Sequence, residues 1–365
     1  MNGVNKNILL AAGGTGGHLH GAQSVALELD SQGCNVYLLT DRRVESLIKG
    51  FKLDNIKEVS SASFTNERIY KWPLVFARLL FGFVSSLIWI KKFKPKLVIG
   101  FGGYPTVPVI LAAKVFGLKI IIHEQNMILG RANKLLANLA DIITLGFIDA
   151  SGVSDKHRDK TSFSGNPIRH ELINTINPYK VFSGNGKFRL IIFGGSQGAS
   201  FFSKTIPASL KMLSSKKRLS LEVFHQVRPE EVQNIKNFYN SNKIIAEVSC
   251  FFDNLPALLN SSHLIISRSG ASTVSEIAAI GRPAIFIPLP HSIDNDQKLN
   301  ASLLEKSGQA IVQKEKEANS DWFYKTIDKL IDSPDTLIKM NKKTNVNKHK
   351  NGAANIGKIV RGFLN

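Results

Sequence analysis

Residues 264–283 read LIISRSGASTVSEIAAIGRP: a strand-like apolar run, then small residues, then a short helical segment. Small side chains around Gly270 leave the next backbone amides accessible, and the positive end of the new helix attracts an anion such as a phosphate. Gly281 and Pro283 are expected to end the helix. A strand, turn and helix in this order predict a parallel α/β sheet with ligands at the carboxyl ends of its strands.

Glu276 lies about one turn into this helix, and two interpretations of its carboxylate stay open at this point. The group can complement the helix dipole, as acidic residues in first turns commonly do. Alternatively, it can accept hydrogen bonds from the two hydroxyls of a ribose whose phosphates occupy the amides.

The same pattern recurs along the chain. Strand-like runs at 8–12, 97–100 and 119–123 precede glycine-rich or polar loops, and the pattern restarts at 190–193 before a second glycine loop at 194–199. We therefore expect an α/β fold of two Rossmann-like, doubly wound domains facing a cleft. The expected segments are 1–164, 165–340, and a tail and helix at 341–365 that can pack back on the first domain.

Composition narrows the classes of partner. The chain of 365 residues has 47 Lys and Arg against 28 Asp and Glu, so its net charge of +19 favours nucleic acid, an anionic membrane or phosphorylated substrates. Aromatic and basic residues do not alternate as in RNA-binding sheets, so no nucleic acid is expected. Cys34 and Cys250 have no neighbours at metal-ligand spacing, and we expect neither a metal nor a cofactor. A nicotinamide site is disfavoured because Leu19 takes the place of the last glycine in the G-x-G-x-x-G pattern.

The segment 72–96 is unusually apolar. Its uninterrupted run, 79–90, is shorter than the roughly 20 residues that span a bilayer, and lysines follow it. Either this is a fully buried crossover helix, or one side of it meets a membrane surface whose anionic headgroups attract the lysines. The second interpretation predicts membrane contacts by Leu79, Phe83, Trp89, Lys91, Lys92 and, in the next helix, Phe116.

Seven motifs are distributed along the chain: Gly13–His18, Gly102–Pro105, His123–Asn126, Gly165–Arg169, Gly194–Ala199, Arg268–Glu276 and Asp296-Gln297. Together they resemble the MurG family of glycosyltransferases over nearly the whole chain. The resemblance implies that the two Rossmann-like domains are of the glycosyltransferase B type. The resemblance implies an inverting hexosyltransferase that moves N-acetylglucosamine (GlcNAc) from UDP-GlcNAc to the N-acetylmuramic acid (MurNAc) 4-hydroxyl of lipid I, giving lipid II for peptidoglycan synthesis. It also implies a peripheral protein on the cytoplasmic face of the bacterial inner membrane, with an anionic membrane surface as partner. The chemistry is expected to need no metal. The lipid acceptor is expected to bind to the first domain and the donor to the second.

The resemblance also assigns substrate-binding residues, position by position. These are Thr15, Gly16, Gly17, Asn126, Arg169, Ser196, Phe252, Ala271, Ser272, Thr273, Val274, Glu276, Asp296 and Gln297. The chain departs from the family pattern at His20-Gly21, where an aromatic residue and a proline are usual, and at Asp296, where some members have glutamine.

The catalytic base has two candidates, His18 and Glu124. His18 stands at a predicted helix start, where the dipole disfavours the imidazolium and keeps the ring able to take a proton. Two other functions stay open: a UDP-GlcNAc 2-epimerase, which needs no acceptor, and a non-catalytic basic membrane-binding protein.

Overall fold

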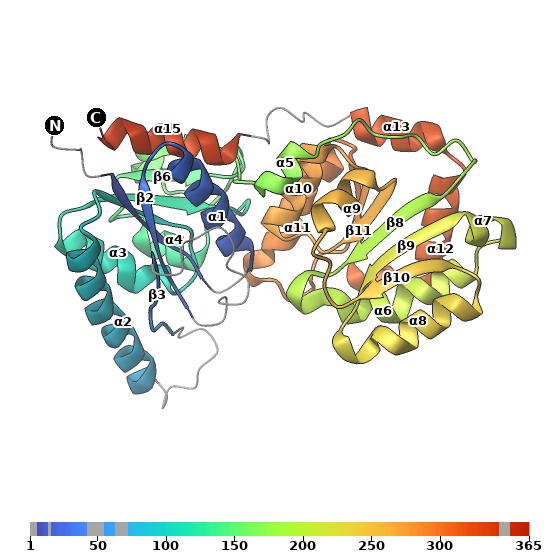
Figure 1. The fold of residues 1–365 in the computed structure, drawn as a ribbon, viewed down its shortest axis with the longest axis horizontal. Coiled ribbons are helices and arrows are strands. Elements are labelled where there is room, and N and C mark those ends of the chain that lie inside the picture. Colours follow the sequence, from blue (N-terminus) through green and yellow to red (C-terminus); the bar gives the residue numbers. More distant parts are fainter. Residues whose placement is uncertain (1–5, 14–15, 42–54, 63–71, 343–350, 365) are drawn as a thin grey trace. The chain divides into compact units, whose positions relative to one another are not determined.

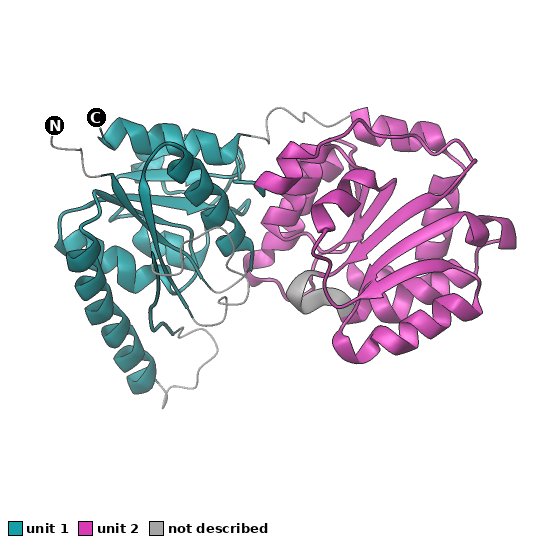
Figure 2. Ribbon diagram, in the orientation of Figure 1, with its two compact units in different colours: residues 1–169, 350–365 teal, residues 170–349 magenta. Residues whose placement is uncertain are grey.

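The structure is a computed structural model that describes residues 6–13, 16–41, 55–62, 72–342 and 351–364 (Figure 1). The chain forms two compact units, Met1–Arg169 with Lys350–Asn365, and His170–His349 (Figure 2). Each unit is a parallel sheet flanked by helices, which confirms the predicted α/β fold.

The first unit contains a seven-stranded sheet in the order β3-β2-β1-β4-β5-β6-β7. Its strands are β1 Asn7–Ala11, β2 Asn35–Thr40, β3 Ile56–Glu58, β4 Leu97–Gly100, β5 Lys119–Glu124, β6 Ile142–Leu145 and β7 Thr161–Phe163. Its α-helices are α1 Gly16–Ser31, α2 Trp72–Phe93, α3 Thr106–Val115, α4 Arg131–Leu136 and α15 Gly352–Leu364. The strand order reverses between β1 and β4, and open α/β sheets bind ligands at such a switch point.

Both faces of this sheet are buried. On β1, Ile8 and Leu10 belong to a core cluster shared with α1 and α15, while Leu9 and Ala11 belong to the cluster shared with α2, α3 and α4. Central strands therefore have to be apolar on both sides, which is why they read as continuous apolar runs.

The C-terminal helix α15 packs on the first unit. Ile356 and Val360 are buried in its core, and Asn355 Nδ2 donates to Ser164 O at 2.9 Å. At its start, a Cβ on Gly352 would overlap the carbonyl of Asn166. This helix therefore holds the segment that leads out of the first unit.

The second unit contains a six-stranded parallel sheet in the order β10-β9-β8-β11-β12-β13. Its strands are β8 Phe188–Phe193, β9 Leu221–Gln226, β10 Ile245–Ser249, β11 Leu264–Ser267, β12 Ala284–Phe286 and β13 Ala310–Val312. Its α-helices are α5 His170–Asn174, α6 Gly195–Lys211, α7 Ser215–Ser220, α8 Val232–Ser241, α9 Leu255–Ser261, α10 Ala271–Ile280, α11 Asp296–Lys306, α12 Ser320–Ile331 and α13 Pro334–Lys342. The switch point lies between β8 and β11, so the second glycine loop and the 267–276 stretch leave neighbouring strands.

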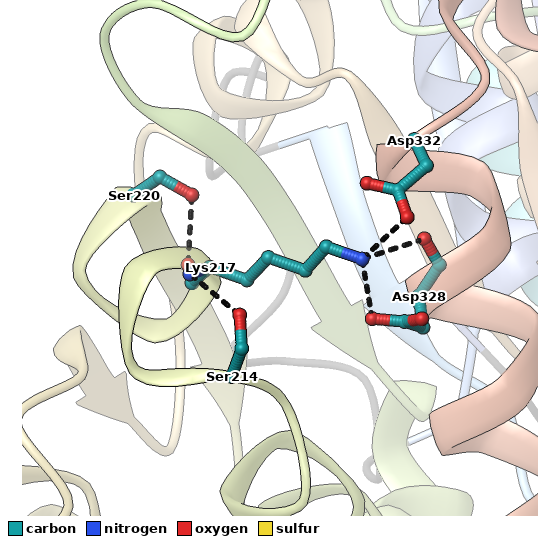
Figure 3. A network of polar contacts seen from close by, with 5 residues as sticks. All are labelled: Ser214, Lys217, Ser220, Asp328 and Asp332. Atoms are coloured by element: carbon teal, nitrogen blue, oxygen red, sulfur yellow. Dashed lines mark hydrogen bonds and ion pairs between the residues drawn. The ribbon is translucent and has the colours of Figure 1, made fainter.

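An ion-pair network fastens the short helix α7 to α12 (Figure 3). Lys217 Nζ lies 2.6 Å from both Asp328 Oδ1 and Asp332 Oδ2. Burial alone would lower the pKa of Lys217, but the two carboxylates outweigh it and raise the pKa above its usual value. The network lies away from the switch point and contributes to the fold of this unit.

Candidate functional site

The start of α10 has the features of an anion site. Gly270 is the N-cap, with φ −59° and ψ 148° and no side-chain cap, and the first amides of an α-helix have no intrahelical partner. Ala271 and Val274 are buried, whereas Ser272 and Thr273 are half-buried. The helix ends at Gly281, whose left-handed φ of 68° favours glycine, so the predicted strand, turn and helix are confirmed.

Glu276 is buried, with 6% of its surface exposed, and lies beyond the first turn of α10, which has no acidic residue. Dipole effects fall off within that first turn. The position therefore argues against the first interpretation, in which the carboxylate complements the helix dipole.

Gln297, at the start of α11, is tied to the backbone around this helix start. Its Oε1 accepts hydrogen bonds from Leu289 N at 3.0 Å and from Ser269 N at 3.4 Å. Because the amide oxygen is used in this way, Nε2 is the atom that can donate to a ligand. The preceding Asp296 accepts from Gln297 N at 2.6 Å, and burial raises the pKa of its carboxyl group.

Three further predicted donor residues lie on other segments. Ser196 is in the first turn of α6, directly after β8, but its side chain is outside the described residues. Phe252 is buried against Phe224, with 6.4 Å between ring centroids. Arg169 is half-buried at the end of the first unit's main segment.

In the first unit, Glu124 ends β5 and its carboxylate is almost fully buried. Oε1 accepts from Asn126 N at 2.9 Å and Asn126 Nδ2 at 3.1 Å; Oε2 accepts from Gly130 N at 2.7 Å and Asn133 Nδ2 at 2.8 Å. Burial raises the pKa of Glu124, and these hydrogen bonds oppose the shift. Both oxygens are thus engaged in holding the 124–130 loop. Sequence reasoning missed Asn133.

A second buried network lies beside this loop. His123 Nε2 is 3.2 Å from Asn166 Oδ1, and its Nδ1 is 3.0 Å from Thr144 Oγ1. Asn166 Nδ2 donates to Gln125 O at 2.9 Å, which orients Oδ1 toward the ring and assigns the proton of the neutral His123 to Nε2. Burial lowers the pKa of His123 to about 4, so the network is uncharged at neutral pH.

His18 lies in the first turn of α1, with its ring against the backbone of Gly102. Burial lowers its pKa to about 4, although the charge of Asp41 raises it. The ring is therefore neutral at pH 7 and can accept a proton, as a general base must. Gly16 and Gly17, which open α1, are half-buried, and Thr15 lies outside the described residues.

Helix α2 lies beside α3 (Figure 1) and exposes an apolar row at every fourth residue. The row consists of Trp72, Phe76, Leu80, Val84 and Ile88, flanked by Leu74, Phe81 and, on and just after α3, Leu111, Val115 and Phe116. Of the predicted membrane residues, Lys91, Lys92 and Phe116 are exposed, whereas Leu79, Phe83 and Trp89 are half-buried. Among the described helices, α2 alone is long and apolar enough to cross a membrane, a test that core helices also pass.

In the part of the chain that the structure describes, no three His, Cys, Asp or Glu side chains lie close enough together to hold a metal ion.

Comparison with known proteins identifies the family. Residues 8–144 match the glycosyltransferase family 28 N-terminal domain, and residues 189–356 match the C-terminal domain. A UDP-N-acetylglucosamine–N-acetylmuramyl-(pentapeptide) pyrophosphoryl-undecaprenol N-acetylglucosamine transferase of Chelativorans sp. (strain BNC1) is 40% identical over 92% of this chain and 90% of its own. The chain belongs to glycosyltransferase family 28. A family 28 relative with the same name from Sinorhizobium medicae is 42% identical over 91% of this chain and 89% of its own.

Solved structures agree with this family 28 assignment. MurG of Acinetobacter baumannii superposes with a TM-score of 0.75 at 26% identity, covering 98% of this chain and 99% of its own. A UDP-GlcNAc 2-epimerase of Neisseria meningitidis bound to UDP-GlcNAc reaches a TM-score of 0.66 at 17% identity, covering 98% and 100%. At that identity the second likeness reflects a shared fold.

Proposed function

We propose that this chain transfers GlcNAc from UDP-GlcNAc to the MurNAc 4-hydroxyl of lipid I and so produces lipid II for peptidoglycan synthesis. The observation that carries the proposal is the 40% identity, over 92% of the chain, to a transferase whose name states this donor sugar and this acceptor. The polar groups at the switch points of both units are of the kinds that these two substrates require.

The second unit supplies the donor contacts in this proposal. The amides at the start of α10 bind the diphosphate, Glu276 accepts the ribose hydroxyls, and Gln297 Nε2 donates to a sugar hydroxyl. Fixed amide dipoles stabilise the charge that develops on the UDP leaving group, so the chemistry proceeds without a metal. Thr15, Gly16, Gly17 and Arg169 stay predicted contacts, as do Ser196, Phe252 and Asp296.

The first unit supplies the acceptor contacts and the base. The acceptor hydroxyl oxygen attacks the anomeric carbon in line with the departing UDP, the carbon–oxygen bond to the diphosphate breaks, and the hydroxyl proton passes to His18. One displacement inverts the anomeric centre. Glu124 keeps Asn126 in place during this step, because its Oε1 accepts hydrogen bonds from both the backbone N–H and the side-chain amide of Asn126.

The apolar row on α2 provides a membrane-binding surface, because the acceptor's polyprenyl chain stays in the bilayer. We place the protein as a peripheral protein at the cytoplasmic face of the inner membrane, with Lys91 and Lys92 next to anionic headgroups. Flotation with vesicles containing anionic lipid tests this surface. Ile88→Asp should abolish binding, whereas Ile245→Asp, at a site of similar exposure in the second unit (56% against 60%), should not. Equal binding by both variants would remove α2 from this role.

A 2-epimerase is the alternative function. The transferase needs an acceptor and the epimerase does not, so dependence on the acceptor separates the two. Labelled UDP-GlcNAc is supplied with and without lipid I, and lipid and nucleotide-sugar fractions are followed. Label in the lipid only when lipid I is present supports the transferase. Epimerised UDP-sugar formed without lipid I would refute it.

A further inference from the structure

We propose that the ion pair between Arg268, which is buried, and Glu315, which is half-buried, positions the donor-sugar part of the site in the second unit. This inference rests on the proposed function. It concerns two residues that are not among the predicted substrate contacts and that act through the loop at 287–289.

Arg268 follows β11 and is only 7% exposed. Its Nη2 lies 2.5 Å from Glu315 Oε2, on the segment after β13, and its Nη1 donates to Ile287 O at 3.0 Å. The guanidinium also lies over the rings of Phe201 and Phe202 on α6, at 5.2 and 5.1 Å from their centroids. One cation thus contacts the segments that follow β8, β12 and β13 at the carboxyl edge of the sheet.

The loop at 287–289 is held from two sides. Arg268 binds the carbonyl of Ile287, and Gln297 Oε1 binds the amide of Leu289 at 3.0 Å. Gln297 also accepts from Ser269 N at 3.4 Å, next to the start of α10. The direction of Gln297 Nε2, the proposed sugar donor, therefore depends on where Arg268 fixes this loop.

Glu315 fixes the orientation of the Arg268 guanidinium through their ion pair. A buried guanidinium whose carboxylate is lost seeks other acceptors, because an uncompensated buried charge is costly. The carbonyl of Ile287 and its neighbours would then shift. The start of α10 is fixed separately, by its own helix and by Asn300 Nδ2, which donates to Ser269 O at 3.3 Å. Loss of the ion pair should thus affect the sugar more than the diphosphate.

Isothermal titration with UDP and with UDP-GlcNAc tests this separation. In Glu315→Gln, the affinity for UDP-GlcNAc should fall about tenfold, equivalent to about 1.4 kcal/mol, while the affinity for UDP changes less than about threefold. The KM for UDP-GlcNAc should rise correspondingly. Glu315→Asp, which keeps the charge, should recover part of the loss, and Arg268→Lys, which keeps the charge but not the planar fork, should repeat it.

Glu222→Gln is the matched control. Glu222 pairs with Arg189 at 2.6 Å in the same unit and is as exposed as Glu315, with 26% against 27% of the side chain accessible. It should change neither affinity. If Glu315→Gln lowers the affinities for UDP and UDP-GlcNAc equally, or lowers neither, the ion pair is structural and the inference is wrong. The same conclusion follows if Glu315→Gln fails to fold while Glu315→Asp binds both ligands as the wild type does. Failure of the wild type to bind UDP-GlcNAc would instead refute the proposed function.

Discussion

The pKa of His18 makes a quantitative prediction for the pH dependence of transfer. Burial lowers this pKa to about 4, against an ordinary value of 6.5. At pH 5.5 a group with a pKa of 4 is about 97% deprotonated, whereas one with a pKa of 6.5 is only about 9% deprotonated. Since the base must be neutral, kcat/KM at pH 5.5 should stay close to its value at pH 7.5. An ordinary histidine would lose about tenfold.

The assay is label transfer from UDP-GlcNAc to lipid I between pH 3 and 8, at limiting donor. On the acid side, the pH at which kcat/KM falls reports the pKa of His18 in the free enzyme, so kcat/KM should fall near pH 4. The value of kcat should fall at a higher pH, because the bound diphosphate favours the imidazolium. Asp41 raises the pKa of His18, so Asp41→Asn should move the kcat/KM limb further down.

His18→Ala separates the two candidate bases. The variant should bind UDP-GlcNAc normally and lose about 10²–10⁴ in turnover, the usual range for general base catalysis. If kcat/KM of the wild type falls near pH 6.5, or if His18→Ala turns over at the wild-type rate, His18 is not the general base. Residual activity in His18→Ala with the same acid limb would transfer the role to Glu124.

Three further predictions follow from particular contacts. Gln297→Glu keeps the oxygen that binds Leu289 N but loses the N–H donor, so kcat/KM for UDP-GlcNAc should fall about 10–100-fold, with UDP affinity unchanged in titration. Gly352→Val places a Cβ against the carbonyl of Asn166 and should destabilise the first unit by about 1–3 kcal/mol in calorimetry. Gly362→Val in the same helix is the control and should not destabilise the unit, because no atom lies near its Cβ position and glycine is itself a poor helix former. Burial lowers the pKa values of His123 to about 4 and of His225 to about 3. Below pH 6.5 the unfolded state binds a proton on each histidine that the folded state does not bind. The free energy of unfolding should therefore fall by about 1.4 kcal/mol per histidine per pH unit as the pH is lowered from 6.5 toward these values. Equal urea midpoints at pH 7.5 and 5.5 would contradict the burial of these histidines as neutral groups.

The fold was largely predictable because the strands are buried on both faces. Runs such as 97–100 and 190–193 have no polar alternation, and the glycine loops after them mark the turns into helices. The end of α10 was predictable too, since Gly281 adopts a backbone conformation that favours glycine.

The orientation of α2 was not predictable from its sequence, because residues 79–90 are apolar on all sides. A tertiary contact decides it: a Cβ on Gly82 would overlap the carbonyl of Ser60, so this side of the helix faces the domain. The row Phe76, Leu80 and Ile88 is therefore the outer one. Apolar residues four positions apart can be found in the sequence of α2. The sequence alone does not show which of the several apolar rows on this helix is exposed.

The role of Glu124 was also hidden from the sequence. Its partners Gly130 and Asn133 come from the loop and helix that follow, and only folding brings their donors onto one carboxylate. Sequence reasoning could place an acid at the end of a strand. It could not show that both oxygens are already hydrogen-bonded.

The most direct test of the proposed function is the product itself. Purified protein is incubated with UDP-GlcNAc and lipid I, released UDP is quantified, and the lipid product is examined by NMR. We predict one UDP released for each lipid disaccharide formed, with a β linkage to the MurNAc 4-hydroxyl. UDP released without disaccharide, or an α-linked product, would contradict the account.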